Sequence, residues 1–330
     1  MKILVVGGAG YVGTKLVNLL LQKNYEVAVL DLFLYGENVF DDIKNNPKLT
    51  IFKGDVRDLN IVKKSLLGCD AVIHLACISN DPSFELNPIL GKSINLDSFE
   101  PFVVLSKKLK TKRFIYASSS SVYGVKSESN VTEDMSLEPL TDYSRYKADC
   151  EKILLKHKSN DFECCILRPA TVCGYSRRQR LDVIVNILTN NAYHTGKIKV
   201  IGGGQMRPNI HIDDMVQAYV SALEASKEKI QGQIFNVGFQ NHTVLELSNM
   251  VKNKVSKKRK VDLEFIETND NRSYHISSRK ITQILNFNPK FKIEDAIDGL
   301  IDAFETKKLI EPLTNTLYFN IARMKELNLE

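Results

Sequence analysis

The sequence feature that most constrains the fold is a set of glycines directly behind a short apolar segment. Residues 3–6 are apolar, and Gly7, Gly10 and Gly13 follow in a GxxGxxG pattern that opens an amphipathic stretch over residues 11–22. In such a turn the first glycine permits a tight bend, the second lets the backbone approach a pyrophosphate, and the third lets helix and strand pack closely. The helix N-terminus offers free N–H groups to phosphate. The pattern predicts a strand–turn–helix unit that binds a dinucleotide.

An acidic residue stands where the next strand should end. Asp31 follows Gly13 at roughly the spacing at which dinucleotide-binding folds place the carboxylate that holds the adenosine ribose hydroxyls. The residues after it, Leu32 and Phe33, are not basic, and the carboxylate would repel a 2′-phosphate. The expected cofactor is therefore NAD rather than NADP. An aspartate that merely caps a turn is the structural alternative.

The alternation of elements predicts the fold class. Short apolar runs recur through the first half of the chain, separated by amphipathic stretches, and after about residue 172 this pattern loosens. Such alternation is typical of a doubly wound parallel sheet. We expect an α/β fold with an NAD-binding Rossmann domain over residues 1–172, return segments within about 210–240, and a smaller α/β substrate-binding domain over residues 173–330. The last residues, from 311 on, carry little signal.

Two further strand ends add candidates for the cofactor site. Asp55 and Val56 follow the third apolar run, where they would meet the adenine, and Leu75 and Ala76 follow the fourth, on the pyrophosphate side. His74 precedes them, and a lone histidine in such a run is more often a core residue. The residues so predicted to bind the cofactor are Gly7, Gly10, Tyr11, Val12, Gly13, Asp31, Asp55, Val56, Leu75 and Ala76.

A tyrosine and a lysine suggest the chemistry. Tyr143 and Lys147 stand one turn apart in a helical pattern, on one face. An ammonium there favours the phenolate and should lower the pKa of the tyrosine, which can then act as a general base towards an alcohol. Serines at 118–121 leave a predicted strand at its carboxyl end, where open α/β sheets bind ligands. A serine there can hydrogen-bond the reacting oxygen.

Composition excludes several other classes of protein. The six cysteines form no CxxC pair and the six histidines show no ligand spacing, so we expect free thiols and no metal site. No segment is long and apolar enough to span a membrane, and the apolar N-terminus is too short for a signal peptide. The net charge of +6 is scattered and indicates no nucleic-acid partner. A cytoplasmic enzyme with a small substrate is expected.

These motifs together resemble the extended short-chain dehydrogenase/reductases, in the family of NAD-dependent nucleotide-sugar epimerases and dehydratases. The resemblance covers essentially residues 1–305. It implies that Ser119, Tyr143 and Lys147 are catalytic, that Asn95 supports the lysine, and that Pro169 flanks the nicotinamide. The substrate implied is a sugar nucleotide, oxidised at C4. The motifs that match are GxxGxxG at 7–13, the acid at 31, HLA at 74–76, the serine run with VYG at 118–124, YxxxK at 143–147 and Arg168-Pro169.

The resemblance also suggests where the sugar nucleotide lies. Arg207 and Arg272 match arginines that meet the substrate diphosphate, and surface salt bridging is their structural alternative. Arg177, Arg178 and Arg180 form a basic stretch that could also face the nucleotide, and they are weaker candidates. Loop residues after the fourth strand are predicted to contact the sugar, and turn formation explains them equally well. The substrate-binding candidates are Ser79, Asn80, Ser83, Ser119, Ser120, Thr171, Arg180, Arg207 and Arg272.

Departures from the family pattern reduce the number of reactions that the chain could catalyse. The 4,6-dehydratases need an acid and a base directly after the catalytic hydroxyl, and this chain has Ser120 and Ser121 there. The common UDP-hexose epimerases carry an asparagine where this chain has Thr171. Residues 76–85, 168–182 and 270–275 carry a finer resemblance, to a branch that serves bacterial capsule biosynthesis, and it implies oxidation of GDP-manno-heptose to the GDP-4-keto-heptose. The alternatives are a UDP-hexose type 4-epimerase and, more distantly, a non-catalytic NAD-sensing or RNA-binding protein.

The family resemblance also implies an assembly. Its members pair the helix after Ile94 with the helix that bears Tyr143 in a four-helix bundle. The apolar side chains within residues 99–109 and 153–155 are compatible with such a homodimer.

Overall fold

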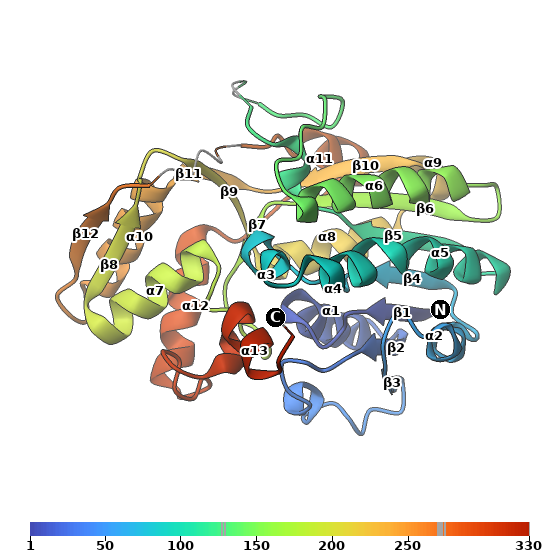
Figure 1. Cartoon of the computed structure of the whole chain (residues 1–330), viewed down its shortest axis with the longest axis horizontal. Helices are drawn as coiled ribbons and strands as arrows, with labels where there is room; N and C mark the ends of the chain where they lie inside the picture. Colours follow the sequence, from blue (N-terminus) through green and yellow to red (C-terminus); the bar gives the residue numbers. More distant parts are fainter. Residues whose placement is uncertain (127, 129, 269–272, 274, 330) are drawn as a thin grey trace.

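A seven-stranded parallel sheet forms the centre of the computed structural model, which describes all residues except 127, 129, 269–272, 274 and 330 (Figure 1). In β1, Ile3 lies opposite Val27 on one side and opposite Ala71 on the other. The chain leaves β1 for β2 and β3 in one direction and resumes at β4 on the other side, so a crevice opens where the order reverses. The sheet confirms the predicted fold class. Its strands in spatial order are β10 (Gln233–Val237), β6 (Glu163–Pro169), β5 (Arg113–Ala117), β4 (Ala71–His74), β1 (Lys2–Val6), β2 (Glu26–Asp31) and β3 (Leu49–Lys53).

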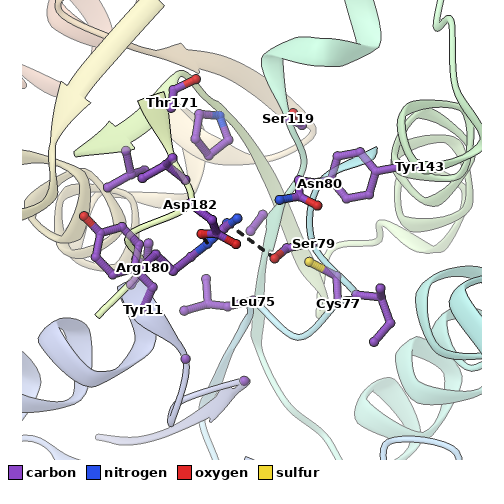
Figure 2. A pocket seen from close by; sticks show the side chains of 18 of the residues that line it. Tyr11, Leu75, Cys77, Ser79, Asn80, Ser119, Tyr143, Thr171, Arg180 and Asp182 are labelled. Atoms are coloured by element: carbon purple, nitrogen blue, oxygen red, sulfur yellow. Dashed lines mark hydrogen bonds and ion pairs between the residues drawn. The ribbon is translucent and has the colours of Figure 1, made fainter. Parts of the chain in front are cut away.

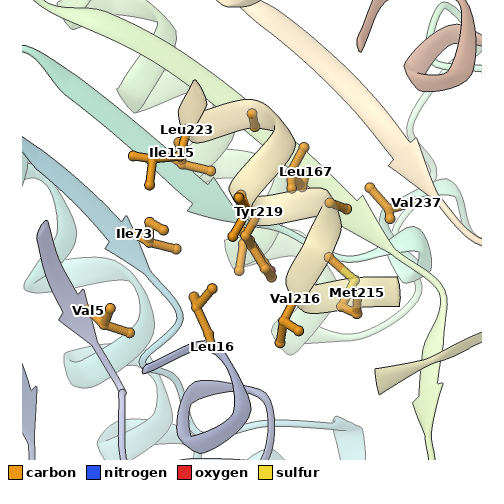
Figure 3. Packing of buried hydrophobic residues seen from close by; sticks show 14 of the residues in the cluster. Val5, Leu16, Ile73, Ile115, Leu167, Met215, Val216, Tyr219, Leu223 and Val237 are labelled. Atoms are coloured by element: carbon orange, nitrogen blue, oxygen red, sulfur yellow. The ribbon is translucent and has the colours of Figure 1, made fainter. Parts of the chain in front are cut away.

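Helices cover both faces of this sheet, because successive strand side chains point to opposite faces and both sets are apolar. Val5 packs on the face covered by α1 (Tyr11–Gln22) and α8 (Ile212–Glu224), whereas Leu4 packs on the other face. Figure 3 shows Tyr219 and Leu223 of α8 against the inner strands. The helices on the opposite face are α2 (Leu59–Leu66), α5 (Phe99–Lys108) and α6 (Asp142–His157).

A second unit lies beyond the carboxyl ends of the strands (Figure 1). It has a separate apolar core, in which the amphipathic faces of its three main helices meet Ile198 and Val200 of β8. The division of the chain into domains at residue 172 stays a prediction. The elements of this unit are β7 (Thr171–Cys173), α7 (Ile184–Thr195), β8 (Lys197–Ile201), β9 (Met206–His211), β11 (Gln240–Thr243), α10 (Val244–Val255), β12 (Asp262–Ile266) and α12 (Ile293–Glu305).

The C-terminal segment returns to the first unit. Met324 of α13 (Asn320–Glu326) is 1% exposed and joins the core cluster on the α5 face, and α13 packs against α3 (Asp81–Leu86). Among the described residues no helix is both long and apolar enough to cross a membrane. The remaining short elements are η1 (Asn38–Phe40), α4 (Pro88–Lys92), η2 (Ser93–Asp97), η3 (Ser120–Tyr123), α9 (Lys227–Ile230), α11 (Arg279–Leu285) and η4 (Thr316–Tyr318).

Candidate active site

A cavity of about 790 Å³ lies at the carboxyl ends of the strands, between the sheet and the second unit. It extends from the glycine turn after β1 to the beginning of β9. Most of the residues that the sequence placed in the site line this one space. They are Gly7, Gly10, Tyr11, Val12, Gly13, Asp31, Val56, Leu75, Ala76, Ser79, Asn80, Ser119, Ser120, Tyr143, Lys147, Pro169, Thr171, Arg180 and Arg207.

Four predicted residues are not in this lining. The Asp55 carboxylate turns to Arg57, whose guanidinium lowers its pKa even though partial burial acts in the opposite direction. Ser83, in α3, and Asn95 are both buried. Arg272 falls outside the described residues. The roles assigned to these residues stay predictions.

The side chain of Asn95 holds the loop that follows β4. Its side chain accepts a hydrogen bond from the Ile78 amide at 2.8 Å and donates one to the Ile78 carbonyl at 2.9 Å. Both ends of the side-chain amide therefore hold the loop that carries Ser79 and Asn80. Asn95 positions the cavity wall in this structure, while its carbonyl accepts from the Cys150 thiol.

The glycine turn after β1 is packed too closely against other backbone segments to carry side chains at Gly7 and Gly13. A Cβ at Gly7, which has a φ of +80°, would lie 2.6 Å from the amide nitrogen of Ala76, and one at Gly13 would lie 2.3 Å from the Gly7 carbonyl. Only glycine permits such an approach. Gly10 precedes α1 and no side chain caps the helix, so its first N–H groups are available to a phosphate. The hydroxyl of Tyr11 donates to the Gly174 carbonyl at 2.6 Å and ties this turn to the second unit.

Asp31 is fixed at the end of β2 by two backbone donors. The amide of Phe33 reaches one carboxylate oxygen at 2.7 Å and that of Ala9 reaches the other at 2.9 Å. Burial raises the pKa of Asp31, and the two amides act against that shift. The carboxylate therefore lines the cavity in a defined orientation, as a ribose diol requires.

The catalytic candidates come together at another part of the cavity. Lys147 is 3% exposed, and its ammonium donates to the Ala117 carbonyl at 2.7 Å while lying 5.9 Å from the centre of the Tyr143 ring. Ser119 follows β5, and its hydroxyl lies 2.8 Å from that of Ser121. Figure 2 shows Ser119 and Tyr143 on one side of the cavity and Tyr11 and Arg180 on the other.

Local structure determines where Tyr143 stands. Helix α6 begins with a capping box in which the side chains of Thr141 and Ser144 satisfy each other's backbone amides. The Thr141 hydroxyl also donates to Asp81 at 2.5 Å, which links this helix start to the loop of Ser79 and Asn80. The first turn of α6, which carries Tyr143, is therefore held by its own capping box and by the contact of Thr141 with Asp81.

A buried ion pair supports the floor of the site. Arg168 donates to both carboxylate oxygens of Glu151, at 2.9 and 2.7 Å, and both side chains are almost fully buried. Ser118 donates to the same carboxylate, and Arg168 contacts the Tyr123 hydroxyl at 2.7 Å. This network explains the Arg168-Pro169 and VYG motifs structurally, because it joins β5, β6 and α6 beneath Ser119 and Tyr143.

Several residues at the cavity escaped the sequence reasoning. Asp182 accepts from Arg180 at 2.8 Å, and Ser79 accepts from Arg180 at 3.4 Å, as Figure 2 shows. Ser79 also accepts from Asn320 at 2.9 Å. Asn320 carried no periodic or motif signal, since it meets the site only through the return of the C-terminal segment. Other lining residues that the sequence did not single out include Tyr35, Cys77, Lys199 and Gln205, whereas Arg178, from the predicted basic stretch, does line the cavity.

Comparisons with known proteins identify the family. Residues 3–238 match the NAD dependent epimerase/dehydratase family. The chain is 28% identical to a UDP-glucose 4-epimerase of Lactobacillus helveticus, over 76% of this chain and 82% of that protein. It is 26% identical to the low-salt glycan biosynthesis protein Agl12 of Haloferax volcanii, over 92% and 98%.

Solved structures are similar over nearly the whole chain. The UDP-glucuronic acid 4-epimerase of Bacillus cereus, in complex with UDP-glucuronic acid and NAD, superposes with a TM-score of 0.83 at 27% identity, over 93% of this chain and 100% of that one. The dTDP-glucose 4,6-dehydratase DesIV of Streptomyces venezuelae, with NAD bound, gives a TM-score of 0.85 at 23% identity, over 95% and 100%. At that identity the second likeness supports the fold alone.

Proposed function

Since the chain belongs to the NAD-dependent epimerase/dehydratase family and is an NAD-dependent enzyme, we propose that its reaction begins with oxidation of the C4 hydroxyl of a nucleotide-activated sugar. The observation that carries this proposal is the convergence of Ser119, Tyr143 and Lys147 in one cavity that extends to Arg207 of the second unit. The cavity thus has room for a sugar between the catalytic side chains and a cation suited to a diphosphate.

Residues of the chain itself can remove the proton of the C4 hydroxyl. Tyr143, as the phenolate, takes the proton of the C4 hydroxyl, and Ser119 hydrogen-bonds the same oxygen as the ketone forms. Lys147 stabilises the phenolate by its charge, and the Ala117 carbonyl holds the ammonium in place. NAD, when bound, accepts the hydride from C4. The turn at Gly7, the carboxylate of Asp31 and Pro169 would hold the dinucleotide against the sugar.

Dehydration does not fit the residues next to Ser119. The positions that would need an acid and a base hold Ser120, which is 2% exposed, and Ser121, whose hydroxyl lies against Ser119. Neither serine exchanges protons readily at neutral pH. The reaction proposed is therefore oxidation at C4, either as a net dehydrogenation or as the first half of an epimerisation.

For the substrate we propose GDP-manno-heptose, oxidised to the GDP-4-keto-heptose in capsule or surface polysaccharide biosynthesis. This proposal depends on the sequence resemblance of the segments at 76–85, 168–182 and 270–275, and in the last of these residues 270–272 and 274 lie outside the described residues. The second candidate, a nucleotide-sugar 4-epimerase, is favoured by the UDP-glucose 4-epimerase and the UDP-glucuronic acid 4-epimerase to which the chain is similar. A non-catalytic role as an NAD sensor or RNA-binding protein does not fit a family of enzymes.

One experiment separates the two candidates. The purified enzyme is offered GDP-, UDP-, dTDP- and CDP-sugars, including GDP-manno-heptose, in deuterated water, and products are identified by NMR while NADH absorbance is followed. A 4-keto product with accumulating NADH supports the dehydrogenase and names its substrate. A sugar inverted at C4 without net NADH establishes an epimerase and overturns the heptose proposal.

We also propose that the enzyme is a homodimer in which α5 and α6 of two copies form a four-helix bundle. Val104 supports this, because it is an apolar side chain on α5 that is 46% exposed in the single chain.

A further inference from the structure

A buried arginine at the cavity has no anionic hydrogen-bond partner. Arg178 is 3% exposed and lines the cavity. One of its terminal nitrogens donates to the side-chain oxygen of Asn320 at 2.6 Å, and its Nε and other terminal nitrogen have no hydrogen-bond partner among the described residues. A buried cation normally has a carboxylate or phosphate against it, because removal from water is costly.

The neighbouring arginine differs in this respect. Arg180 is paired with Asp182 at 2.8 Å, and that carboxylate has its pKa lowered by Arg180 against the effect of burial. Arg178 instead has the neutral amide of Asn320 on one side and the ring of Tyr35 on its face, with the ring centre 3.7 Å from the guanidinium carbon. The Asp182 carboxylate acts on Arg178 by charge alone, without a hydrogen bond to it. Burial and the nearby Arg180 lower the pKa of Arg178 to about 10, so the group is still charged at neutral pH.

The position of Arg178 along the cavity indicates which anion it would meet. Its charge is attracted by Asp31, the carboxylate at the ribose end, and repelled by Arg180. Arg180 in turn interacts with Tyr143 at the catalytic end. Arg178 is thus near the ribose carboxylate, and Arg180, which is near Arg178, is also near the catalytic tyrosine. A dinucleotide bound by Asp31 at one end and reacting beside Tyr143 at the other must place its diphosphate between them.

We propose that Arg178 binds the diphosphate of the dinucleotide from the side opposite the glycine turn, and that Asn320 of the C-terminal helix positions it. The inference rests on the proposed site for NAD. The two unpartnered nitrogens, which together carry three N–H donors, supply charge-assisted hydrogen bonds to phosphate oxygens. These complement the backbone N–H groups at the start of α1.

Asn320 is itself held in place by hydrogen bonds to two residues of the cavity. Its backbone amide donates to Asp182 at 2.9 Å and its side-chain nitrogen donates to Ser79 at 2.9 Å, so only the side-chain oxygen faces Arg178. Arg323, one turn later, donates to the Leu34 carbonyl at 2.6 Å, beside Tyr35. The C-terminal helix is therefore attached to the cofactor side of the cavity at several points, and Asn320 is a positioning residue.

Ligand binding in the absence of any sugar tests the proposal. The affinities of the full-length protein for NADH, ADP and adenosine are measured by calorimetry for the wild type, Arg178→Gln and Arg177→Gln. Arg177 is a matched control in the same loop, because it is exposed and pairs with Asp42 at the surface. Arg178→Gln should weaken NADH and ADP about tenfold to a hundredfold and leave adenosine nearly unchanged, whereas Arg177→Gln should change none of them.

Two further variants distinguish ligand binding from folding. Arg178→Lys keeps the charge and should recover part of the ADP affinity. Asn320→Asp places a carboxylate beside Arg178, which should compete with the diphosphate and weaken ADP several-fold. Unchanged ADP affinity in both Arg178→Gln and Asn320→Asp, or an equal loss for adenosine and ADP, overturns the proposal. Because no sugar is present, failure of the C4 oxidation would leave these results unaffected.

Discussion

The side chains proposed for the chemistry are fixed by contacts made behind them. Lys147 is held by the carbonyl that ends β5, and Tyr143 stands in a helix turn capped by Thr141 and Ser144. Ser119 is the first residue after Ser118, which is tied to the buried Glu151. Preorganisation of this kind means that a change at one reacting atom should affect catalysis more than binding.

Replacement of Tyr143 by phenylalanine tests the assignment of the general base. The variant lacks only the phenolic oxygen, so turnover should fall by about 10²–10⁴-fold. NADH affinity, measured by calorimetry, should stay close to that of the wild type. Turnover that is unchanged by this substitution would contradict the mechanism.

His74 gives a second prediction at this scale. Its ring is 3% exposed among Phe99, Phe102 and Phe114, neither nitrogen has a hydrogen-bond partner among the described residues, and burial lowers its pKa to about 3. The unfolded chain binds this proton near pH 6.5, whereas the folded chain stays neutral down to about pH 3. The contribution of His74 to stability is therefore present above pH 6.5 and is lost as the pH falls through this window.

Urea unfolding at pH 7 and pH 5 measures this effect. The wild type should lose about 2 kcal/mol more than His74→Leu between the two pH values, since leucine binds no proton. Equal losses in the two proteins would show that His74 binds its proton equally well in the folded and the unfolded chain, which would contradict the lowered pKa.

At the scale of the elements, the strand–turn–helix unit at the N-terminus depends on glycine for steric reasons. Helix α1 crosses so close to the turn that a Cβ at Gly13 would meet two backbone carbonyl oxygens, those of Gly7 and Gly8, at 2.3 and 2.6 Å. Backbone atoms cannot move aside as a flexible side chain would. The close packing of helix and strand is what brings the N–H groups of α1 to the cavity.

Gly13→Ala should therefore lower the free energy of unfolding by about 1–3 kcal/mol and weaken NADH binding. Gly299→Ala is the control, because that glycine lies within α12 and nothing is within 4 Å of its added Cβ. The control should be neutral or stabilising by up to about 1 kcal/mol. Urea unfolding and NADH calorimetry on the two variants make the comparison. A Gly13→Ala protein as stable as the control would contradict the steric account.

At the scale of the whole molecule, segments that are far apart in sequence build one cavity. The first unit supplies the glycine turn and the catalytic side chains, β9 supplies Arg207, and the loop after β7 supplies Arg178 and Arg180. Asn320, in the C-terminal helix, hydrogen-bonds two of the lining residues, Arg178 and Ser79. The cavity therefore depends on how the two units and the C-terminal segment pack, and not on either unit alone.

The proposed dimer makes a prediction about the outer surface. Val104→Glu places a charge at the centre of the proposed bundle and should convert a dimer to monomers in analytical ultracentrifugation. Ile310→Glu, at a 61% exposed position after α12, is the matched control and should not change the mass. A wild-type monomer, or a Val104→Glu dimer, would refute the four-helix interface.

The sequence by itself determined the features that depend on local spacing. The glycines at 7, 10 and 13, the acid at 31 and the tyrosine–lysine pair at 143 and 147 are close in sequence to the strands or helix that carry them. Strand–helix alternation then requires a parallel sheet, whose carboxyl ends gather these residues at one edge. For this reason the fold class, NAD and most of the cavity lining could be predicted without coordinates.

Only the tertiary structure decided the contacts between distant segments. Asp55 faces Arg57, Asn95 holds Ile78, and Arg178 meets Asn320, although residues 311–330 gave no signal. Side-chain contacts of this kind could not be predicted from the sequence, because periodicity and local spacing indicate only which residues are neighbours within one helix, strand or turn. The direction in which a loop side chain points, and the partner it finds there, depends on how the two units and the C-terminal helix pack together.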